Sequence, residues 1–213
     1  MTKRKDGQET RGRLLNVACK VFAQKGYRKA MVADICKRAD ANVAAVNYYF
    51  GGKAGLYAET WRYLFEQFEK SLLAALEDGS PQEQLRQYIQ ILLKNYTTKG
   101  KLGYFSRLYM TELVNPTGLI QDMWHELVDP RRKKLQDIVR AIIGPEADHE
   151  SVLFCEVSIV NQCRVLSTVK HSDLEFFLEH PLDAALIKRL ADHIVDFSLA
   201  GIRALGKRKT SSD

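Results

Sequence analysis

The sequence has few of the residues and motifs that mark catalytic, metal-binding or redox proteins. Its 213 residues include only four cysteines, with no CxxC pair, and five histidines that lack the spacing of metal ligands. The P-loop, HExxH, GxSxG and glycine-rich dinucleotide motifs are all missing. These absences argue against an enzyme, and we expect neither a metal nor a cofactor.

Long apolar runs are missing as well. No stretch approaches the roughly 18 consecutive apolar residues of a membrane-spanning helix. The first residues, MTKRKD, are polar and lack the apolar segment of a secretory signal. With 46% hydrophobic and 27% charged residues, the composition is ordinary for a soluble globular protein. We therefore expect a cytoplasmic protein without a membrane partner.

Positive charge is concentrated at one end of the chain. Residues 1–60 carry 12 Lys and Arg against 5 Asp and Glu, whereas the rest carries 20 against 21. A basic head on a nearly neutral body suggests a polyanionic partner, with nucleic acid the leading candidate. The alternative is a basic surface that serves only solubility.

The apolar pattern predicts an all-α protein. Apolar residues recur every three or four positions, and no alternating β-branched stretch is long enough for a sheet. We expect about nine helices, covering residues 9–25, 31–39, 43–50, 53–77, 81–97, 102–114, 118–143, 148–170 and 183–205.

Several residues predict where these helices start, stop or bend. Gly26 suits a left-handed stop, and Ser80 with Glu83 has the spacing of a capping box. Pro130 lies inside a helical pattern and predicts a kink or a break there. Two terminal segments are expected to be loose, residues 1–8 and 207–212.

The helices at 31–39 and 43–50, joined by a short turn, have the features of a helix-turn-helix. Ala39 is small where the two helices would touch, Asn42 can cap the second helix, and Val46 and Phe50 can anchor it from beneath. In this motif the second helix enters the major groove. The residues expected to face wholly or partly outward are Ala44, Ala45, Asn47, Tyr48 and Tyr49.

Several short stretches of the chain carry a resemblance to a known family. The stretches LLNVA (14–18), FAQKG (22–26), VADI (32–35) and VNYYFGGK (46–53) resemble the N-terminal domain of the TetR family of bacterial repressors. GLY at 55–57, RLYMTEL at 107–113 and PT at 116–117 resemble the CecR-like subgroup. The chain departs from the family pattern at four positions. Asp40 stands where the family has glycine, Asn42 where it has serine or threonine, Asn47 where it has an aromatic residue and Ala54 where it has an acidic residue.

The resemblance implies both the architecture and the function. Residues 1–55 would form a three-helix helix-turn-helix DNA-binding domain, and residues 56–213 a larger helical domain for effector binding and dimerisation. The two long helices at 148–170 and 183–205 would pair with their copies in a homodimer, although both could instead belong to an intramolecular core. The expected function is a repressor that leaves a palindromic operator when a small-molecule effector shifts the spacing of the two heads.

The same resemblance assigns the DNA contacts. Lys53 would sit at a helix N-terminus, which suits phosphate. The first turn of the second helix offers only methyl groups, which read thymine, and Asn47 can pair with adenine, so we expect A·T pairs at the contacted positions. Residues 3–5 and Arg11 either add contacts or are simply solvated. The expected DNA-binding residues are Lys29, Met31, Asn42, Val43, Ala44, Ala45, Asn47, Tyr48, Tyr49 and Lys53.

An effector pocket in the body is the second expectation from the resemblance. Aromatic residues at helical spacing are also typical of an ordinary core. Glu112 shares a face with apolar residues, so it must find a partner, either a cationic or polyaromatic ligand or, as the favoured alternative, an arginine such as Arg107 or Arg164. The expected ligand-binding residues are Trp61, Phe65, Tyr88, Phe105, Tyr109, Glu112, Trp124 and Gln162.

Two other classes of DNA-binding protein remain open. One is a thiol sensor, although Cys155 and Cys163 are about 12 Å apart along a straight helix and cannot pair directly. Cys19 and Cys36 fall on inward faces of the head. The other is a regulator or architectural protein that ignores small molecules, and the lack of excess positive charge on the body argues against DNA wrapping.

Overall fold

The computed structural model describes residues 2–73, 76, 79–98 and 100–210. These residues form ten α-helices and no strand, so the all-α prediction is confirmed. By their internal contacts the helices divide into two compact units, Met1–Phe68 with Thr98–Leu127, and Glu69–Thr97 with Val128–Asp213. The expected functional boundary at residue 55 stays a prediction.

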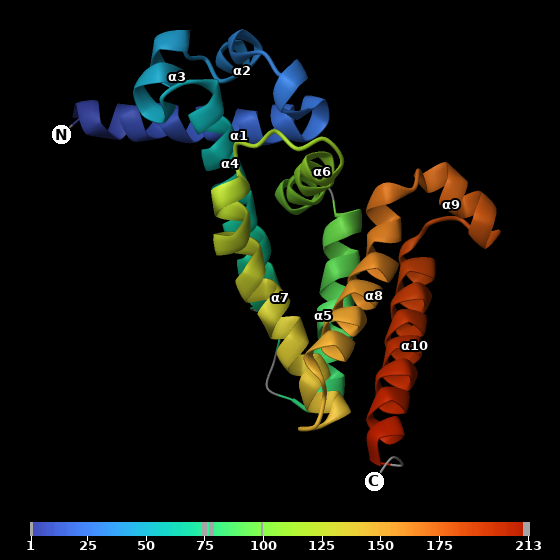
Figure 1. Cartoon of the computed structure of the whole chain (residues 1–213). Helices are drawn as coiled ribbons and strands as arrows, with labels where there is room; N and C mark the ends of the chain where they lie inside the picture. Colours follow the sequence, from blue (N-terminus) through green and yellow to red (C-terminus); the bar gives the residue numbers. More distant parts are fainter. Residues whose placement is uncertain (1, 74–75, 77–78, 99, 211–213) are drawn as a thin grey trace. The chain divides into compact units, whose positions relative to one another are not determined.

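The first unit contains the helix-turn-helix. Its helices are α1 (Thr2–Lys29), α2 (Val32–Arg38), α3 (Val43–Phe50), most of α4 (Lys53–Leu73), α6 (Lys101–Val114) and the start of α7 (Gln121–Ile143). Helix α1 packs against α2, α3 and α6 (Figure 1). The predicted apolar stripe of α1 forms the centre of this core, because Leu14, Ala18, Val21 and Phe22 are all fully buried.

The second unit is built around long helices. It contains α5 (Pro81–Thr97), the rest of α7, α8 (His149–Thr168), α9 (His171–Leu178) and α10 (Ala184–Thr210). Helices α5, α8 and α10 contact one another and run side by side (Figure 1). In α8 a buried carboxylate is held inside this packing, where Arg132 Nε and Gln136 Nε2 donate to Glu156 at 2.7 and 2.6 Å.

The predicted caps are confirmed. Asn42 Oδ1 accepts from the Ala45 amide at 2.8 Å, and α3 spans the predicted residues 43–50. In the capping box before α5, Glu83 Oε2 accepts from the Ser80 amide at 2.7 Å and Ser80 Oγ accepts from the Glu83 amide at 3.3 Å. Gly26, at φ 68°, interrupts α1, which resumes for one more turn to Lys29.

At Pro130 a kink or a break was expected; helix α7 runs through this residue without a break, and the kink stays a prediction. Two other local expectations were wrong. Residues 2–8 and 207–210 are helical rather than loose. Helix α9 was not predicted; it has only eight residues, of which Leu174 alone is buried. The expected end of α4 near residue 77 and the tail beyond residue 210 lie outside the described residues.

Candidate nucleic-acid interface and effector pocket

The turn between α2 and α3 is stabilised by the conformation of Asp40 and by a hydrogen bond from Arg13. Asp40 adopts the left-handed conformation at φ 48°, as its replacement of glycine requires. Arg13 of α1 donates from Nε to the Ala39 carbonyl at 3.1 Å, which satisfies the end of α2. Ala39 and Val46 are buried at 2% and 0% exposure, so a small contact residue and an apolar anchor lie where the motif needs them. Sequence reasoning missed Arg13.

One face of α3 is left open by this packing. Val43 is 49% exposed and Tyr48 82% exposed, and Asn42, Ala44 and Asn47 are exposed as well. Ala45 is half-buried. Tyr49 is also half-buried, because its ring packs against Tyr48 and Phe50 with centroids 4.9 and 6.4 Å away. Tyr48 is therefore the more accessible of the two tyrosines.

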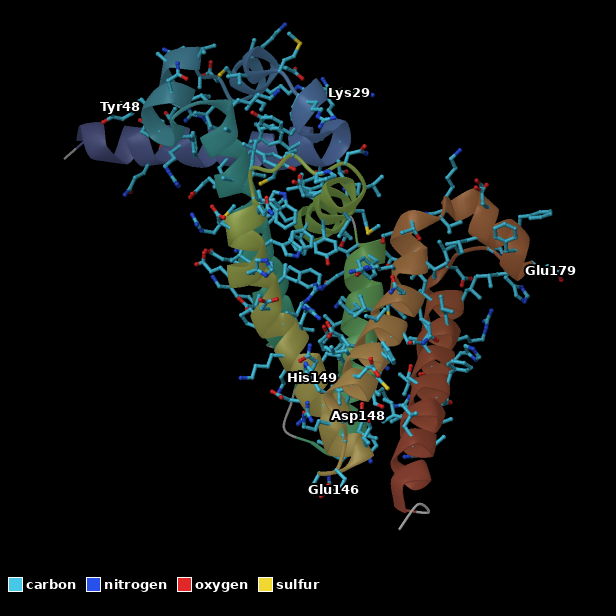
Figure 2. The ribbon with its side chains drawn as sticks, in the orientation of Figure 1. Lys29, Tyr48, Glu146, Asp148, His149 and Glu179 are labelled. Carbon is cyan, nitrogen blue, oxygen red and sulfur yellow. The ribbon has the colours of Figure 1, made fainter. Side chains whose placement is uncertain are left out.

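The remaining expected DNA contacts flank this face. Lys29 and Met31 are exposed where α1 ends and α2 begins, and Lys29 and Tyr48 lie on either side of α2 (Figure 2). Lys53 is half-buried at the N-terminus of α4. Its Nζ donates to the Arg28 carbonyl at 3.4 Å and lies 4.6 Å from the centroid of the Tyr27 ring. Lys53 thus braces the end of α1 in this structure.

An ion-pair network that sequence reasoning missed stiffens α2. Asp34 accepts from Lys25 Nζ at 2.9 Å and from Arg38 Nε at 2.8 Å. The hydrogen bond from Lys25, followed by that from Arg38, lowers the pKa of the Asp34 carboxyl. The four-residue spacing of Asp34 and Arg38 is the signal that predicts half of this network.

Most of the expected ligand-binding aromatics form one cluster in the first unit. Trp61 contacts Phe105, Tyr109 and Trp124 at centroid distances of 5.5, 6.2 and 5.8 Å. Phe65 contacts Phe105 at 5.7 Å. Tyr109 and Trp124 stack at 5.0 Å with an interplanar angle of 20°. Five of the eight expected residues are thus brought together by α4, α6 and α7.

Glu112 lies at the edge of this cluster and is 5% exposed. Tyr57 donates its hydroxyl to Oε2 at 2.8 Å, and the amide and hydroxyl of Thr117 donate to Oε1 at 2.7 and 2.8 Å. The expected pairing with Arg107 was wrong, because that guanidinium lies over the Tyr104 ring instead. Arg164 belongs to the second unit, where its Nη1 donates to Asn161 Oδ1.

A cavity of about 510 Å³ opens beside Glu112 in the first unit. Burial, followed by the hydrogen bond to Glu112 and the charge of Glu112, raises the pKa of Tyr57, so its hydroxyl stays protonated. The residues that line the cavity come from the end of α6, the following turn and the start of α7: Glu112, Leu113, Pro116, Gly118, Ile120, Gln121, Trp124 and His125.

Tyr88 and Gln162, the other two expected ligand residues, belong to the second unit. Tyr88 is 1% exposed, and burial raises the pKa of its hydroxyl to about 12. Gln162 lines a groove of about 280 Å³ between α8 and α10, and its Nε2 donates to the Ser158 carbonyl at 3.4 Å.

The thiols show no feature of a reactive site. Burial raises the pKa of Cys19 and Cys163 to about 12, and it raises the pKa of Cys36 and Cys155 as well. Since the thiolate is the reactive form, these environments disfavour a thiol sensor. Across the described ranges, His, Cys, Asp and Glu side chains form no group of three that could hold a metal ion.

No helix of the described chain could cross a membrane alone, and only the pair α8 and α9, bent by 114°, reaches the required length and hydropathy together.

These features define a class: an all-helical DNA-binding regulator with a helix-turn-helix. Family models match in two places. Residues 14–60 match the bacterial regulatory proteins of the tetR family, and residues 81–202 match the C-terminal domain of the HTH-type transcriptional dual regulator CecR. The chain therefore belongs to the TetR family of transcriptional regulators, with a CecR-type C-terminal domain.

Curated relatives agree with this family. The HTH-type regulator YttP of Bacillus subtilis is 29% identical over 114 residues, covering 54% of this chain and 55% of the relative. AcrR of Shigella flexneri is 27% identical over 133 residues, covering 58% of this chain and 60% of the relative. The chain thus spans little more than half the length of these two relatives.

Solved structures agree in fold. A transcriptional regulator from Rhodococcus sp. superposes with a TM-score of 0.66 at 18% identity, covering 90% of this chain and 94% of the other. PfmR, a TetR family regulator from Thermus thermophilus, has a TM-score of 0.62 at 19% identity, with 88% and 97% covered.

Proposed function

We propose that the chain is a cytoplasmic, homodimeric repressor that binds a palindromic operator and leaves it when a small-molecule effector binds. The observation that carries this proposal is the open face of α3. A helix capped by Asn42 and anchored by the buried Val46 keeps Val43, Asn47 and Tyr48 exposed, as a recognition helix in the major groove requires.

The exposed side chains of α3 suggest what the operator contains. Val43, Ala44 and Ala45 present methyl groups, which can contact the thymine methyl but cannot hydrogen-bond to a base edge. Asn47 can accept and donate to adenine. Tyr48 and Tyr49 then contact the phosphates, together with Asn42, Lys29, Met31 and Lys53 from the flanking elements. A·T pairs are therefore expected in each half-site.

The apolar surface of the second unit favours a homodimer. Phe154, Val157 and Phe197 are 62%, 54% and 63% exposed on the neighbouring helices α8 and α10. Exposed apolar patches of this kind mark interfaces, and the same patch on a second copy can pair with it about a two-fold axis. Two heads related by that axis fit a palindrome. Residues 1–55 serve as the DNA-binding domain and residues 56–213 as the effector-binding and dimerisation domain.

Repression and effector release are supported by different observations, the first by relatives of the chain and the second by its own structure. One relative, NicS of Pseudomonas putida, is an HTH-type transcriptional repressor, which favours repression. The CecR model is described as a dual regulator, which makes activation at some promoters the second candidate. The aromatic cluster around Trp61, with the cavity beside Glu112, offers an effector site within the first unit.

The test is selection of DNA from a random library with the full chain, followed by affinity measurements on the selected site. The expected result is a palindrome with A·T pairs in each half-site, bound by a dimer. Tyr48→Ala should weaken binding at least about tenfold, because a hydrogen bond to a charged phosphate is lost. Phe176→Ala removes an equally exposed aromatic ring (79% against 82%) from α9 and should leave DNA binding unchanged.

Two outcomes contradict the proposal. Selection of sequences without symmetry or preference argues for an architectural DNA-binding protein. Half-sites made only of G·C pairs contradict the assigned readout by Val43, Ala44 and Ala45. Asn47→Ala supplies a finer check, since it should relax the preference for adenine at one position and keep the rest of the site.

A further inference from the structure

The cavity beside α6 contains a buried charge that the fold does not neutralise. Glu112 is 5% exposed and accepts three hydrogen bonds, all from the neutral donors of Tyr57 and Thr117. Among the described residues, no lysine, arginine or histidine forms an ion pair with it. Buried carboxylates in proteins are usually paired with a cation. Glu156 follows that rule, because it is bound by Arg132.

The hydrogen bonds of Glu112 leave room for one more partner. A carboxylate offers about four acceptor positions. Thr117 occupies two at Oε1 and Tyr57 occupies one at Oε2. The unfilled position is therefore at Oε2, the oxygen that Tyr57 also uses.

The cavity around this carboxylate matches an apolar cation. Glu112 is the only Asp, Glu, Lys or Arg among its lining residues, and His125 is the one other titratable side chain there. Trp124, stacked on Tyr109, supplies an aromatic wall, and Leu113 and Pro116 add apolar surface. A volume of about 510 Å³ is ample for an organic ligand of drug size. Aromatic faces also attract cations directly.

We propose that this cavity is the effector site and that its ligand is a lipophilic ammonium ion, whose charge pairs with Glu112 and whose apolar part lies against Trp124. This inference rests on the proposed function and adds the ligand's chemical class. An anion is repelled by the carboxylate, and a neutral ligand leaves the buried charge without a counter-ion.

Tyr57 connects this site to the DNA-binding helices. Its hydroxyl is bound to Glu112, and its ring contacts Phe22 and Tyr27 of α1, each with centroids 5.0 Å away. An ammonium ion in the free position at Oε2 weakens the hydrogen bond that the Tyr57 hydroxyl donates to the same oxygen. The ring can then shift against α1, which packs on α2 and α3. Coupling of this kind is reciprocal, so DNA must weaken ammonium binding as much as ammonium weakens DNA binding.

The tryptophans of the chain can report ligand binding by their fluorescence. Its two tryptophans, Trp61 and Trp124, are 5.8 Å apart beside the cavity. Tryptophan fluorescence of the full chain is titrated with phenylbutylammonium, with pentylbenzene as the neutral compound of the same shape, and with phenylpentanoate as the anion. The ammonium ion should bind about tenfold or more tighter than pentylbenzene, as a charge-assisted contact requires, and phenylpentanoate should not bind.

Two matched variants test whether Glu112 supplies the charge that binds the ammonium ion. Glu112→Gln keeps the size of the side chain and should abolish the preference for the ammonium ion over pentylbenzene. Glu126→Gln removes an exposed carboxylate from the neighbouring α7 and should leave that preference unchanged. Thermal unfolding of each variant shows that it is folded. If Glu112→Gln does not fold, the comparison of the three compounds on the wild-type chain still decides the ligand class.

Equal binding of all three compounds, or the same ammonium preference in Glu112→Gln, overturns the proposal. Release from the selected operator tests the coupling. The ammonium ion should weaken DNA binding by the wild-type chain, whereas in Tyr57→Phe it should bind the cavity without affecting DNA. Unchanged release in Tyr57→Phe refutes the route through Tyr57. Failure to bind any DNA contradicts the proposed function instead, and the fluorescence titration, which contains no DNA, separates the two failures.

Discussion

Replacing Tyr57 by phenylalanine tests the bond between α4 and Glu112 as a stability effect. Tyr57 is fully buried, and its hydroxyl is the only described hydrogen-bond donor to Oε2 of Glu112, at 2.8 Å. A hydrogen bond to a charged group contributes about 1.5–3 kcal/mol, and its loss leaves that oxygen buried without a donor. We therefore expect the free energy of unfolding to fall by about 2–3 kcal/mol. For a chain of this size Tm should fall by about 4–12 °C.

The measurement is chemical and thermal unfolding followed by tryptophan fluorescence. Both tryptophans belong to the unit that contains Tyr57, so the signal reports on this unit. Tyr48→Phe is the matched control, because it removes a hydroxyl from a ring that is 82% exposed and should leave Tm unchanged. In a Glu112→Gln background the same Tyr57→Phe change should lower the free energy of unfolding by less, since the carboxylate charge is gone. Equal Tm values for Tyr57→Phe and Tyr48→Phe would refute the assigned role of this bond.

Three further predictions concern other parts of the chain. Asn42→Ala and Asp148→Ala each remove an N-cap, with bonds of 2.8 and 2.7 Å, and each should lower stability by about 1 kcal/mol. Only Asn42→Ala should also weaken operator binding in a gel-shift assay, and equal binding by both variants would contradict the assignment of α3. The buried thiol of Cys163, whose pKa is raised from 9.0 to about 12, ionises first in the unfolded chain, so stability is lost as pH rises between these values, by about 1.4 kcal/mol per pH unit. Denaturant midpoints at pH 8 and 10 should therefore differ less in Cys163→Ala than in the wild type, and an equal difference excludes this source of the pH dependence. Phe197→Asp puts a charge on the exposed face of α10 and should give a monomer in analytical ultracentrifugation, and a persistent dimer would place the interface elsewhere.

Local features of the fold could be predicted because they depend on residues a few positions apart. The cap of α3 by Asn42, the capping box of Ser80 and Glu83, and the left-handed Asp40 all involve atoms within about one helical turn of each other. The apolar periodicity that placed Val46 beneath α3 is equally local. The family pattern rests on the same stretch of chain, so the class of protein followed from the sequence as well.

The candidate site could be predicted only in part. Of the expected ligand residues, Trp61, Phe105 and Tyr109 do contact one another, because aromatic side chains on neighbouring helices gather in a shared core, while their role in ligand binding stays a prediction. Sequence reasoning gave Glu112 the wrong protein partner, since the choice between Arg107 and Tyr57 depends on how α4 and α6 pack. No local pattern encodes a contact between residues 55 positions apart.

The sequence alone determined the helical class, the capped helix α3 and the basic head, because backbone propensity, capping and charge are properties of short segments. Only the tertiary structure decided that α7 continues through Pro130, that Lys53 braces α1, and that Glu112 is buried with neutral donors beside a cavity. Each of these depends on which side chains from distant segments share one enclosed space. Burial there removes water as an alternative partner, so the packing itself selects the contacts.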